Sequence, residues 1–457
     1  MKYKIGIIGA GTYGSYIVDS LQRNYPNVDI VLYEVGNSTI KSEKEIGFSS
    51  FLKKDDYKGL SDGRWFGYGG TSEKWGGQIL KFSLNDFNNT SNFMRELIII
   101  TEKRWVNILN KLNISEYKND TKITVDLNLK TGVWLSLFKR NFFRHFKIAK
   151  RKNVIIKSNT RVTNISLTSD SEKANLTLLK DGCSNNEEVD FVFLAAGAFE
   201  SVRLLMNSGI INDNKVSFGD HISKSIFNIQ GPTKIGNIDF AFKLKGTSLE
   251  TTRIVGEIDD ISYYCHPVFN SDYSFFQALK NILFKKTISF QDSVNLIKGL
   301  KDLFKFSYTA LIKRKIYVKN NNWNLYLDVE NFFENNFIEL SDKKDKYNQF
   351  GIDVSYSISE ESLECFDIAS NKIELFLKEN NVNYTKTNER IGVKKMEDIY
   401  HPYGMLNNMR TVKEYFEKYD KLLLVSTAIL PKSGSINPTA ALFPLIDEFV
   451  ENTLKFK

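Results

Sequence analysis

The chain has 457 residues, of which 42% are hydrophobic and 25% are charged, and this composition is typical of soluble globular proteins. Its length exceeds what one ordinary hydrophobic core accommodates and predicts two domains. The chain has 62 basic and 54 acidic residues and a formal net charge of +8. This balance lacks the strong basic excess that is typical of nucleic-acid-binding proteins.

The sequence contains no pattern for a membrane span, a signal peptide or a metal site. No apolar run reaches the roughly 18 residues that a spanning helix needs, and the first lysines lead directly into a predicted strand. The three cysteines are far apart, and no pair of the four histidines has metal-ligand spacing. We therefore expect a cytoplasmic protein without a metal.

The N-terminal residues match the pattern of a dinucleotide-binding βαβ unit. A strand, a helix and a second strand are predicted over residues 3–8, 15–24 and 28–33. The turn after the first strand has the spacing G-x-G-x-x-G, which permits a tight turn, a close backbone approach to a pyrophosphate and close helix–strand packing. This pattern predicts a nucleotide site but does not distinguish FAD from NAD.

The residues of this unit have separate expected roles. Gly9, Gly11 and Gly14 are the three glycines, and Thr12 lies beside the helix N-terminus that offers free N–H groups to phosphates. Glu34 follows the second strand, 20 residues after the last glycine, and is expected to accept hydrogen bonds from the adenosine ribose.

A second glycine-rich segment, G-Y-G-G-T-S-E-K-W-G-G, covers residues 67–77. Few helices or strands tolerate so many glycines, and such a loop lets backbone N–H groups approach phosphate or a flat ring. A flexible surface loop is the alternative, against which the embedded tryptophan argues. The residues expected to contact a cofactor are Gly70, Thr71, Trp75, Gly76 and Gly77.

Residues 189–205 predict a strand-to-helix crossing in the middle of the chain. An apolar strand leads to the small residues Ala196 and Gly197, and a helix that contains Ser201 follows. Taken alone, this pattern indicates simple packing. Beside a nucleotide site, it leaves room for a cofactor.

Two further segments lie near the C-terminus. Residues 400–404 have the sequence Y-H-P-Y-G and contain His401. Asn437, Pro438 and Thr439 follow a predicted strand and precede a predicted helix over residues 440–454. The structural alternative for the asparagine is an N-cap, with the proline in the first helical turn.

In order and spacing, these segments resemble the glucose–methanol–choline (GMC) oxidoreductase family, in its sugar and polyol branch. Residues 69–77 are similar to the family's glycine-rich FAD segment, residues 196–205 to its A-G-A-x-x-[ST]-x-x-L-L segment, and residues 400–404 and 437–439 to its H-P-x-G and N-P-T segments. The resemblance implies an α/β fold in which a discontinuous Rossmann-like FAD-binding domain accompanies an α+β substrate domain on a mostly antiparallel sheet.

The resemblance also implies site residues. His401 would be the catalytic base and Asn437 the residue that orients the substrate oxygen, while the backbone of Val162 would contact the adenine. Ser426 stands where the family often has an aspartate. Glu73 and its neighbour occupy the stretch in which some relatives carry a flavin-linking histidine, so we expect non-covalent FAD.

The domain boundaries follow from the same resemblance. The FAD-binding domain is expected over residues 1–90, 150–222 and 395–457, and the substrate domain over residues 223–394. Residues 91–149 would form a helical and loop connection near the cleft. Of the remaining histidines, His221 is interpreted as structural, and His266 is expected in a substrate-domain loop.

The implied activity is oxidation of an alcohol group on a sugar, polyol or glycosylated substrate, with O₂ or a redox partner as the electron acceptor. One alternative is oxidation of a hydrophobic sterol or lipid alcohol, which the 13% aromatic content would suit. Another is a flavoprotein isomerase without net oxidation. A nucleotide-binding module without catalysis would not need both His401 and the N-P-T segment.

Two segments, residues 138–152 and 273–319, combine basic and apolar side chains. Surface helices that cover the substrate cleft are one interpretation. The other is docking to an anionic membrane or recognition of an anionic substrate.

Overall fold

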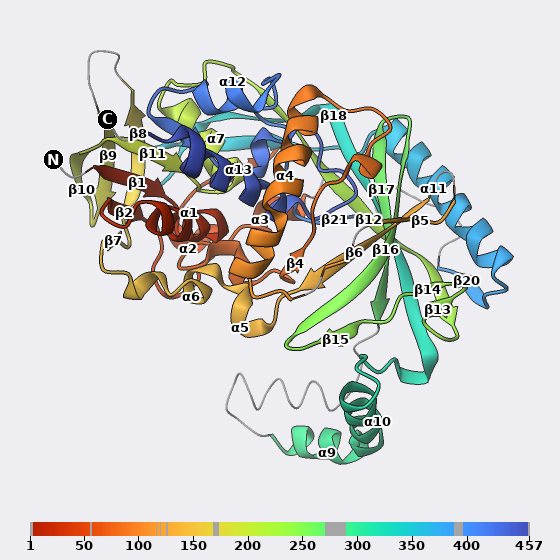
Figure 1. Ribbon diagram of the computed structural model, residues 1–457. Coiled ribbons are helices and arrows are strands. Elements are labelled where there is room, and N and C mark those ends of the chain that lie inside the picture. Colours follow the sequence, from red (N-terminus) through yellow and green to blue (C-terminus); the bar gives the residue numbers. More distant parts are fainter. Residues whose placement is uncertain are drawn as a thin grey trace.

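The chain is described here from a computed structural model. The described residues are 3–54, 57–115, 117–118, 120–124, 127–167, 173–269, 289–387 and 396–455. A parallel sheet with its helices occupies one half of the molecule, and a large twisted sheet occupies the other (Figure 1). None of the helices in these ranges combines the length and the apolar character needed to cross a bilayer.

The parallel sheet draws its strands from distant parts of the chain. Its strands, in spatial order, are β22 (Leu422–Leu424), β11 (Phe191–Leu194), β1 (Lys4–Ile8), β2 (Asp29–Tyr33) and β7 (Val154–Lys157). All four adjacent pairs are parallel. The strand β1 is central and almost completely buried, which explains its run of apolar residues.

Helices cover the parallel sheet and complete the first hydrophobic core. The helices that contribute to it include α1 (Thr12–Asn24), α4 (Asn92–Lys111), α7 (Ala198–Asn207) and α13 (Phe443–Glu448). Tyr16 of α1 stacks on Phe443 of α13 with ring centroids 4.3 Å apart. The two ends of the chain are therefore packed together.

The large sheet is mostly antiparallel. Its main path runs through β20 (Tyr384–Lys386), β12 (Val216–Gln230), β18 (Asn322–Lys344), β17 (Ile261–Phe269), β16 (Ser248–Ile258), β6 (Asn128–Trp134) and β4 (Gln78–Ile79). Further strands at its margins are β3 (Ser50–Leu52), β5 (Thr121–Lys122), β15 (Lys243–Lys245), β19 (Phe350–Ser355) and β21 (Glu397–Asp398). The helix α11 (Glu360–Glu379) packs against this sheet, and together they form a second core.

Smaller elements connect these layers. An antiparallel sheet of β8 (Arg161–Ser166), β9 (Ala174–Lys180) and β10 (Cys183–Val189) lies beside the parallel sheet, and β13 (Lys234–Ile235) pairs with β14 (Ile238–Asp239). The other helices are α2 (Glu43–Ile46), α3 (Lys58–Ser61), α5 (Leu137–Arg140), α6 (Phe142–His145), α9 (Phe290–Lys298), α10 (Leu300–Leu311) and α12 (Val412–Glu417). Short 3₁₀ turns include Gly70–Glu73, Thr427–Ile429 and Pro438–Leu442.

The predicted fold class is confirmed, since a parallel and a mostly antiparallel sheet are both present. Three local expectations are wrong. Residues 128–134, assigned above to a connection, form a strand of the large sheet. His266 lies in β17 rather than in a loop. The helix expected over residues 440–454 is divided, because Pro444 has no backbone N–H to continue the preceding turn and lies instead in the first turn of α13.

Candidate active site

An open cleft with about 1360 Å³ of space lies at the carboxyl ends of β1, β2, β11 and β22. From β1, one neighbouring strand is β2 and the other is β11, so the cleft is at a reversal of strand order, where parallel α/β sheets bind ligands.

Each of the three motif positions requires a glycine for a different structural reason. Gly9 has φ +102°, and an added Cβ would lie 2.5 Å from the carbonyl oxygen of Ala195. At Gly14 an added Cβ would lie 1.8 Å from the carbonyl oxygen of Gly9, so this position is closed by the turn itself. Gly11 differs, because its Cβ would face the cleft with no atom closer than the Cα of Gly70 at 4.0 Å. The space beside Gly11 fits a pyrophosphate.

This contrast provides a matched pair of variants. Gly11→Ala is expected to fold normally and to bind FAD about 5- to 150-fold more weakly, the equivalent of about 1–3 kcal/mol of overpacking. Gly14→Ala is expected to lower the melting temperature, because its methyl group overlaps the turn. Titration with FAD and thermal unfolding measure the two effects. Equal FAD affinity in Gly11→Ala and the unmodified chain would contradict a pyrophosphate at this position.

Glu34 is hydrogen-bonded to the glycine turn that follows β1. Its carboxylate accepts the backbone N–H groups of Ala10 and Gly36, both at 2.8 Å. Burial raises the pKa of Glu34, and these N–H donors oppose that shift. Each oxygen retains acceptor capacity, so the carboxylate can accept a further hydrogen bond, and its contact with a ribose hydroxyl stays a prediction.

The glycine-rich loop is divided between two tasks. Gly70 and Thr71 line the cleft, opposite the first motif. Trp75 instead donates from Nε1 to the carbonyl oxygen of Arg140 at 3.0 Å. An added Cβ at Gly76 would lie 2.3 Å from Trp134. The second half of the loop therefore packs against β6 and α5 rather than lining the cleft.

Not every predicted cofactor residue lines this cleft. Those that do are Gly9, Gly11, Thr12, Glu34, Gly70, Thr71, Val162, Ala196, Gly197, Ser426, Pro438 and Thr439. The residues outside the lining are Gly14, Trp75, Gly76, Gly77, Ser201 and Asn437. Ser201 is buried in α7, and its hydroxyl has no hydrogen-bond partner among the described residues.

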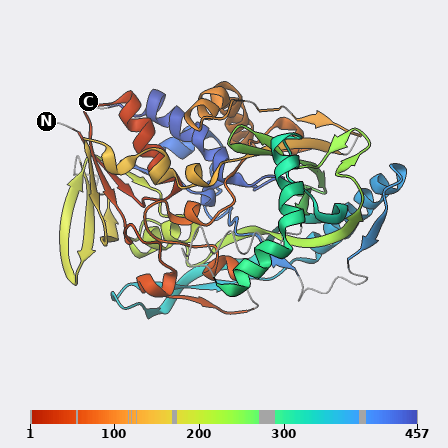
Figure 2. The same ribbon diagram turned by 90° about the horizontal axis from the view of Figure 1, so that it is seen from below.

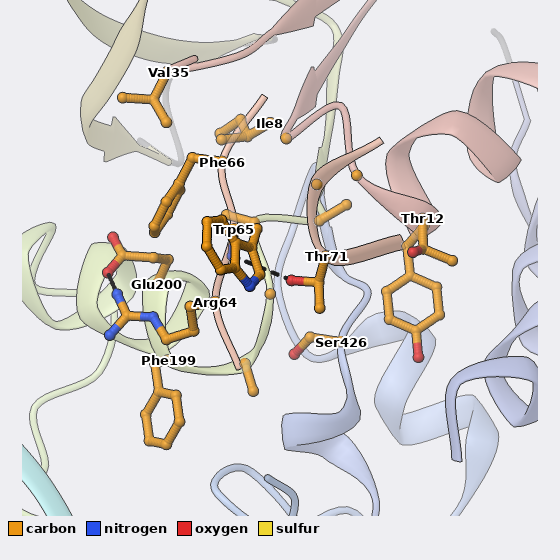
Figure 3. A pocket seen from close by; sticks show the side chains of 18 of the residues that line it. Ile8, Thr12, Val35, Arg64, Trp65, Phe66, Thr71, Phe199, Glu200 and Ser426 are labelled. Atoms are coloured by element: carbon orange, nitrogen blue, oxygen red, sulfur yellow. Dashed lines mark hydrogen bonds and ion pairs between the residues drawn. The ribbon is translucent and has the colours of Figure 1, made fainter. Parts of the chain in front are cut away.

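Charged and aromatic side chains that carry no motif form one wall of the cleft (Figure 3). Glu200 forms ion pairs with Arg64 at 2.5 Å and with Arg203 at 2.7 Å. Arg161 stacks over Phe48, with the guanidinium carbon 4.1 Å from the ring centroid. Arg161 also forms an ion pair with Asp345 at 2.5 Å, so each of these arginines has an acidic partner within the protein.

Trp65 extends into the cleft beside Phe66 and Thr71 (Figure 3). Its backbone N–H donates to the hydroxyl of Thr71 at 3.4 Å, and its indole N–H donates to the carbonyl oxygen of Asp62 at 2.8 Å. No motif in the sequence marked this residue. Its ring supplies a flat apolar surface within a site otherwise made of backbone and charged groups.

His401 and Asn437 meet at one end of the cleft. His401 lines it, and its Nε2 lies 3.3 Å from Nδ2 of Asn437. Asn437 occupies the N-cap position of the 3₁₀ turn Pro438–Leu442, with Pro438 in its first turn, but its side chain makes no capping hydrogen bond. The two side chains are half-buried and come from segments that flank β22.

A buried arginine of β16 determines how Asn437 is oriented. Nη2 of Arg253 donates to Oδ1 of Asn437 at 3.1 Å and also to Oε1 of Gln78. A guanidinium only donates hydrogen bonds, so the amide atom of Asn437 that faces Arg253 must be the acceptor Oδ1. The donor Nδ2 therefore faces His401. Nε2 of His401 is then the acceptor, and the imidazole carries its proton on Nδ1.

Burial lowers the pKa of His401 to about 3, and the nearby His221 and Arg253 act in the same direction. The imidazole is therefore neutral at neutral pH and able to accept a proton. His221 is fully buried, and its Nε2 lies 2.7 Å from the carbonyl oxygen of Gly434, which accords with the structural interpretation of this residue.

The loop that carries His401 is held by a buried carboxylate. Oδ1 of Asp220 accepts the backbone N–H of His401 at 2.8 Å and that of His221 at 2.7 Å, and Oδ2 accepts the hydroxyl of Tyr57 at 2.6 Å. Burial raises the pKa of Asp220 to about 7. The sequence shows Asp220 beside His221 but contains no signal that it positions His401, 181 residues away.

Comparisons with known proteins give matches among solved structures. No protein-family profile and no curated protein sequence matches the chain. Pyridoxine 4-oxidase from Mesorbium loti is 13% identical, with a TM-score of 0.59 over 99% of both chains. A fungal aryl-alcohol oxidase is 11% identical, with a TM-score of 0.52 over 98% of both chains.

A third solved structure is a formate oxidase from Aspergillus oryzae RIB40, studied for FAD modification. It is 12% identical, with a TM-score of 0.50 over 98% of both chains. Similarity over nearly the whole length means that both sheets are matched, not only the dinucleotide-binding part. The chain therefore has the fold that these oxidases share.

Proposed function

We propose that this chain is an FAD-dependent oxidoreductase of the GMC type that oxidises an alcohol group on a sugar, polyol or glycosylated substrate. The observation that carries the proposal is the pairing of His401 with Asn437 at the end of a dinucleotide-type cleft. The fold shared with three oxidases, one of them studied for FAD modification, supports the same chemistry.

The paired side chains supply what alcohol oxidation requires from the protein. Bound FAD would accept the hydride that leaves the substrate carbon. A substrate hydroxyl group that replaced the direct contact between the two side chains would accept a hydrogen bond from Nδ2 of Asn437 and donate its proton to Nε2 of His401. The lowered pKa of His401 keeps Nε2 unprotonated for this step.

An anaerobic substrate screen tests the proposal. The FAD-loaded protein is mixed without oxygen with sugars, polyols, pyridoxine and an aryl alcohol, and bleaching of the flavin is followed. Bleaching by a sugar or polyol supports the proposal. Bleaching only by pyridoxine or the aryl alcohol would support alcohol oxidation but contradict a sugar or polyol substrate. No bleaching by any alcohol would contradict an alcohol oxidoreductase. Oxygen consumption with the best substrate then separates an oxidase from a dehydrogenase.

Arg253→Met is expected to lower the rate of flavin reduction by about 10- to 150-fold. Its hydrogen bond to Asn437 comes from a charged donor, for which about 1.5–3 kcal/mol is typical, and each 1.36 kcal/mol is tenfold in rate. Loss of the cation should also raise the pKa of His401, so the rate should begin to fall at a higher pH than in the unmodified chain.

Arg253→Lys is the matched control for this positioning residue. It retains the cation near His401 and should keep the acidic limb of the pH profile in place, even if the hydrogen bond to Asn437 is poorer. FAD content is measured in both variants. An unchanged rate and an unchanged pH profile in Arg253→Met would show that this arginine only fills space.

We also propose that FAD is bound without a covalent link. Residues 69–77 contain no histidine, cysteine or tyrosine, and the hydroxyl of the preceding Tyr68 is hydrogen-bonded to Ser158. Glu73 is engaged with Asn141 at 2.6 Å. Acid precipitation is expected to release all of the yellow colour into the supernatant. Flavin that remains with the precipitated protein would contradict this.

A further inference from the structure

The helices α9 and α10, in green, extend from the lower side of the molecule in the view of Figure 1. Figure 2, which looks at this side, shows them in front of the rest of the chain. They follow β17 and precede β18 along the chain. Residues 273–288 of the basic segment 273–319 lie outside the described residues.

One face of α10 is apolar and exposed. The side chains on it are Leu300 (46% exposed), Phe304 (73%), Tyr308 (57%) and Leu311 (67%). They recur after four, four and three residues, which places them along one stripe of an α-helix. No residue of α10 is buried. Single exposed apolar residues are ordinary, whereas an aligned row marks an interaction surface.

Basic side chains surround this row. Between residues 290 and 319 the chain has seven lysines and arginines and two aspartates. One of those acids, Asp302, forms an ion pair with Lys319 at 2.9 Å. The exposed basic residues of this stretch are Lys298, Lys301, Lys305, Lys313 and Arg314. An apolar stripe bordered by lysines is the pattern of helices that lie in the headgroup region of a membrane.

A second apolar and basic projection lies on the same side. Leu137 and Phe138 of α5 are 63% and 92% exposed and are followed directly by Lys139 and Arg140. In Figure 1, α5 lies at the lower edge of the parallel-sheet half of the molecule. The rest of the basic segment 138–152 is not an exposed apolar helix. Its aromatic residues Phe142, Phe143 and Phe146 are buried.

We propose that residues 137–140 and 298–314 form a docking surface that binds an anionic lipid membrane peripherally. The exposed apolar side chains would enter the headgroup layer, and the surrounding lysines and arginines would contact acidic headgroups. Two separate projections on one side of the molecule suit a flat partner. A second copy of the chain suits this surface less well, because a two-fold interface would bring the same basic residues face to face.

Vesicle co-sedimentation of the full chain tests the proposal. The probes are phosphatidylcholine vesicles with and without phosphatidylglycerol, at low and at high salt. We expect binding to the anionic vesicles at low salt that is at least about tenfold tighter than to neutral vesicles, and that weakens at high salt because the electrostatic part is screened. Absence of binding to anionic vesicles at low salt would overturn the proposal.

Phe304→Asp with Leu311→Asp is the decisive variant, since both positions are exposed and carry no fold-stabilising burial. We expect at least about tenfold weaker binding to anionic vesicles. Val106→Asp is the control, because Val106 is 66% exposed on α4 and lies outside the docking surface. Melting temperature and FAD content should be unchanged in both.

Two outcomes of this comparison would overturn the proposal. One is equal vesicle binding by the double variant and the unmodified chain. The other is a concentration-dependent dimer that the double variant abolishes, together with no vesicle binding, because the surface would then belong to a second copy of the chain. Light scattering without lipid detects that dimer.

Discussion

His401→Ala is expected to lower the rate of flavin reduction by about 10²- to 10⁴-fold, the usual contribution of a positioned general base. The side chain lines the cleft, and its Nε2 lies 3.3 Å from the amide of Asn437. The anchoring of this loop uses the backbone N–H of His401 and therefore survives the substitution. FAD binding and melting temperature should accordingly stay close to those of the unmodified chain, and rapid-mixing measurements under anaerobic conditions give the rate.

The pH dependence provides a second readout for His401. With a pKa of about 3, the imidazole remains neutral well below neutral pH. The rate of flavin reduction should therefore show no loss from His401 protonation between about pH 5 and pH 8, and should fall only as the pH approaches the pKa. A histidine with an ordinary pKa of about 6.5 would already lose activity at pH 6.

His145→Ala serves as the control for removal of an imidazole. His145 is half-buried on α6, and its Nε2 lies 3.2 Å from the carbonyl oxygen of Lys111, outside the lining of the cleft. Its removal should leave the rate within about twofold. If His401→Ala reduces flavin as fast as His145→Ala, the general-base assignment is wrong.

Lys130→Met is expected to lower the free energy of unfolding by about 3–5 kcal/mol, because it leaves buried carboxylates without their cation. Lys130 is fully buried in β6. Its Nζ lies 2.8 Å from Asp86 and 2.9 Å from Asp120. Asp86 also accepts a hydrogen bond from the hydroxyl of Ser435 at 2.9 Å. Ser435 lies two residues before Asn437, so Lys130→Met should also disturb the segment that carries Asn437.

Chemical denaturation of matched variants separates this effect from loss of a lysine in general. Lys122→Met removes an exposed lysine from the neighbouring strand β5 and should change stability by no more than about 0.5 kcal/mol. Replacing Asp86 and Asp120 by asparagine together with Lys130→Met should recover part of the loss, because no unpaired charge then remains. A loss below about 1 kcal/mol for Lys130→Met alone would show that the carboxylates find other compensation.

Much of the dinucleotide-binding half could be predicted because its constraints are local. Gly9 needs a positive φ and Gly14 has no room for a Cβ, and both requirements depend on neighbours within one turn or one adjacent strand. The spacing to Glu34 is likewise set by one helix and one strand. Such constraints leave a pattern in the sequence whatever the rest of the chain does.

The candidate active site was only partly predictable. His401 and Asn437 belong to short segments with a recognisable pattern, so their identity could be proposed before their contact was seen. Arg253 and Asp220 could not, because each lies in a long strand of the large sheet where charged and apolar residues alternate without a motif. Cytoplasmic location and the domain boundaries stay predictions.

The sequence by itself determined the glycine turn, the acid that follows β2 and the two C-terminal segments, since these depend on backbone conformation and spacing over a few residues. Only the tertiary structure decided that the side chain of Asn437, at the N-cap position of a 3₁₀ turn, contacts Arg253 and His401 instead of making a capping hydrogen bond. The physical reason is that the buried guanidinium of Arg253 requires hydrogen-bond acceptors. Gln78 and Asn437 supply them, and these residues lie 175 and 184 positions away in the sequence.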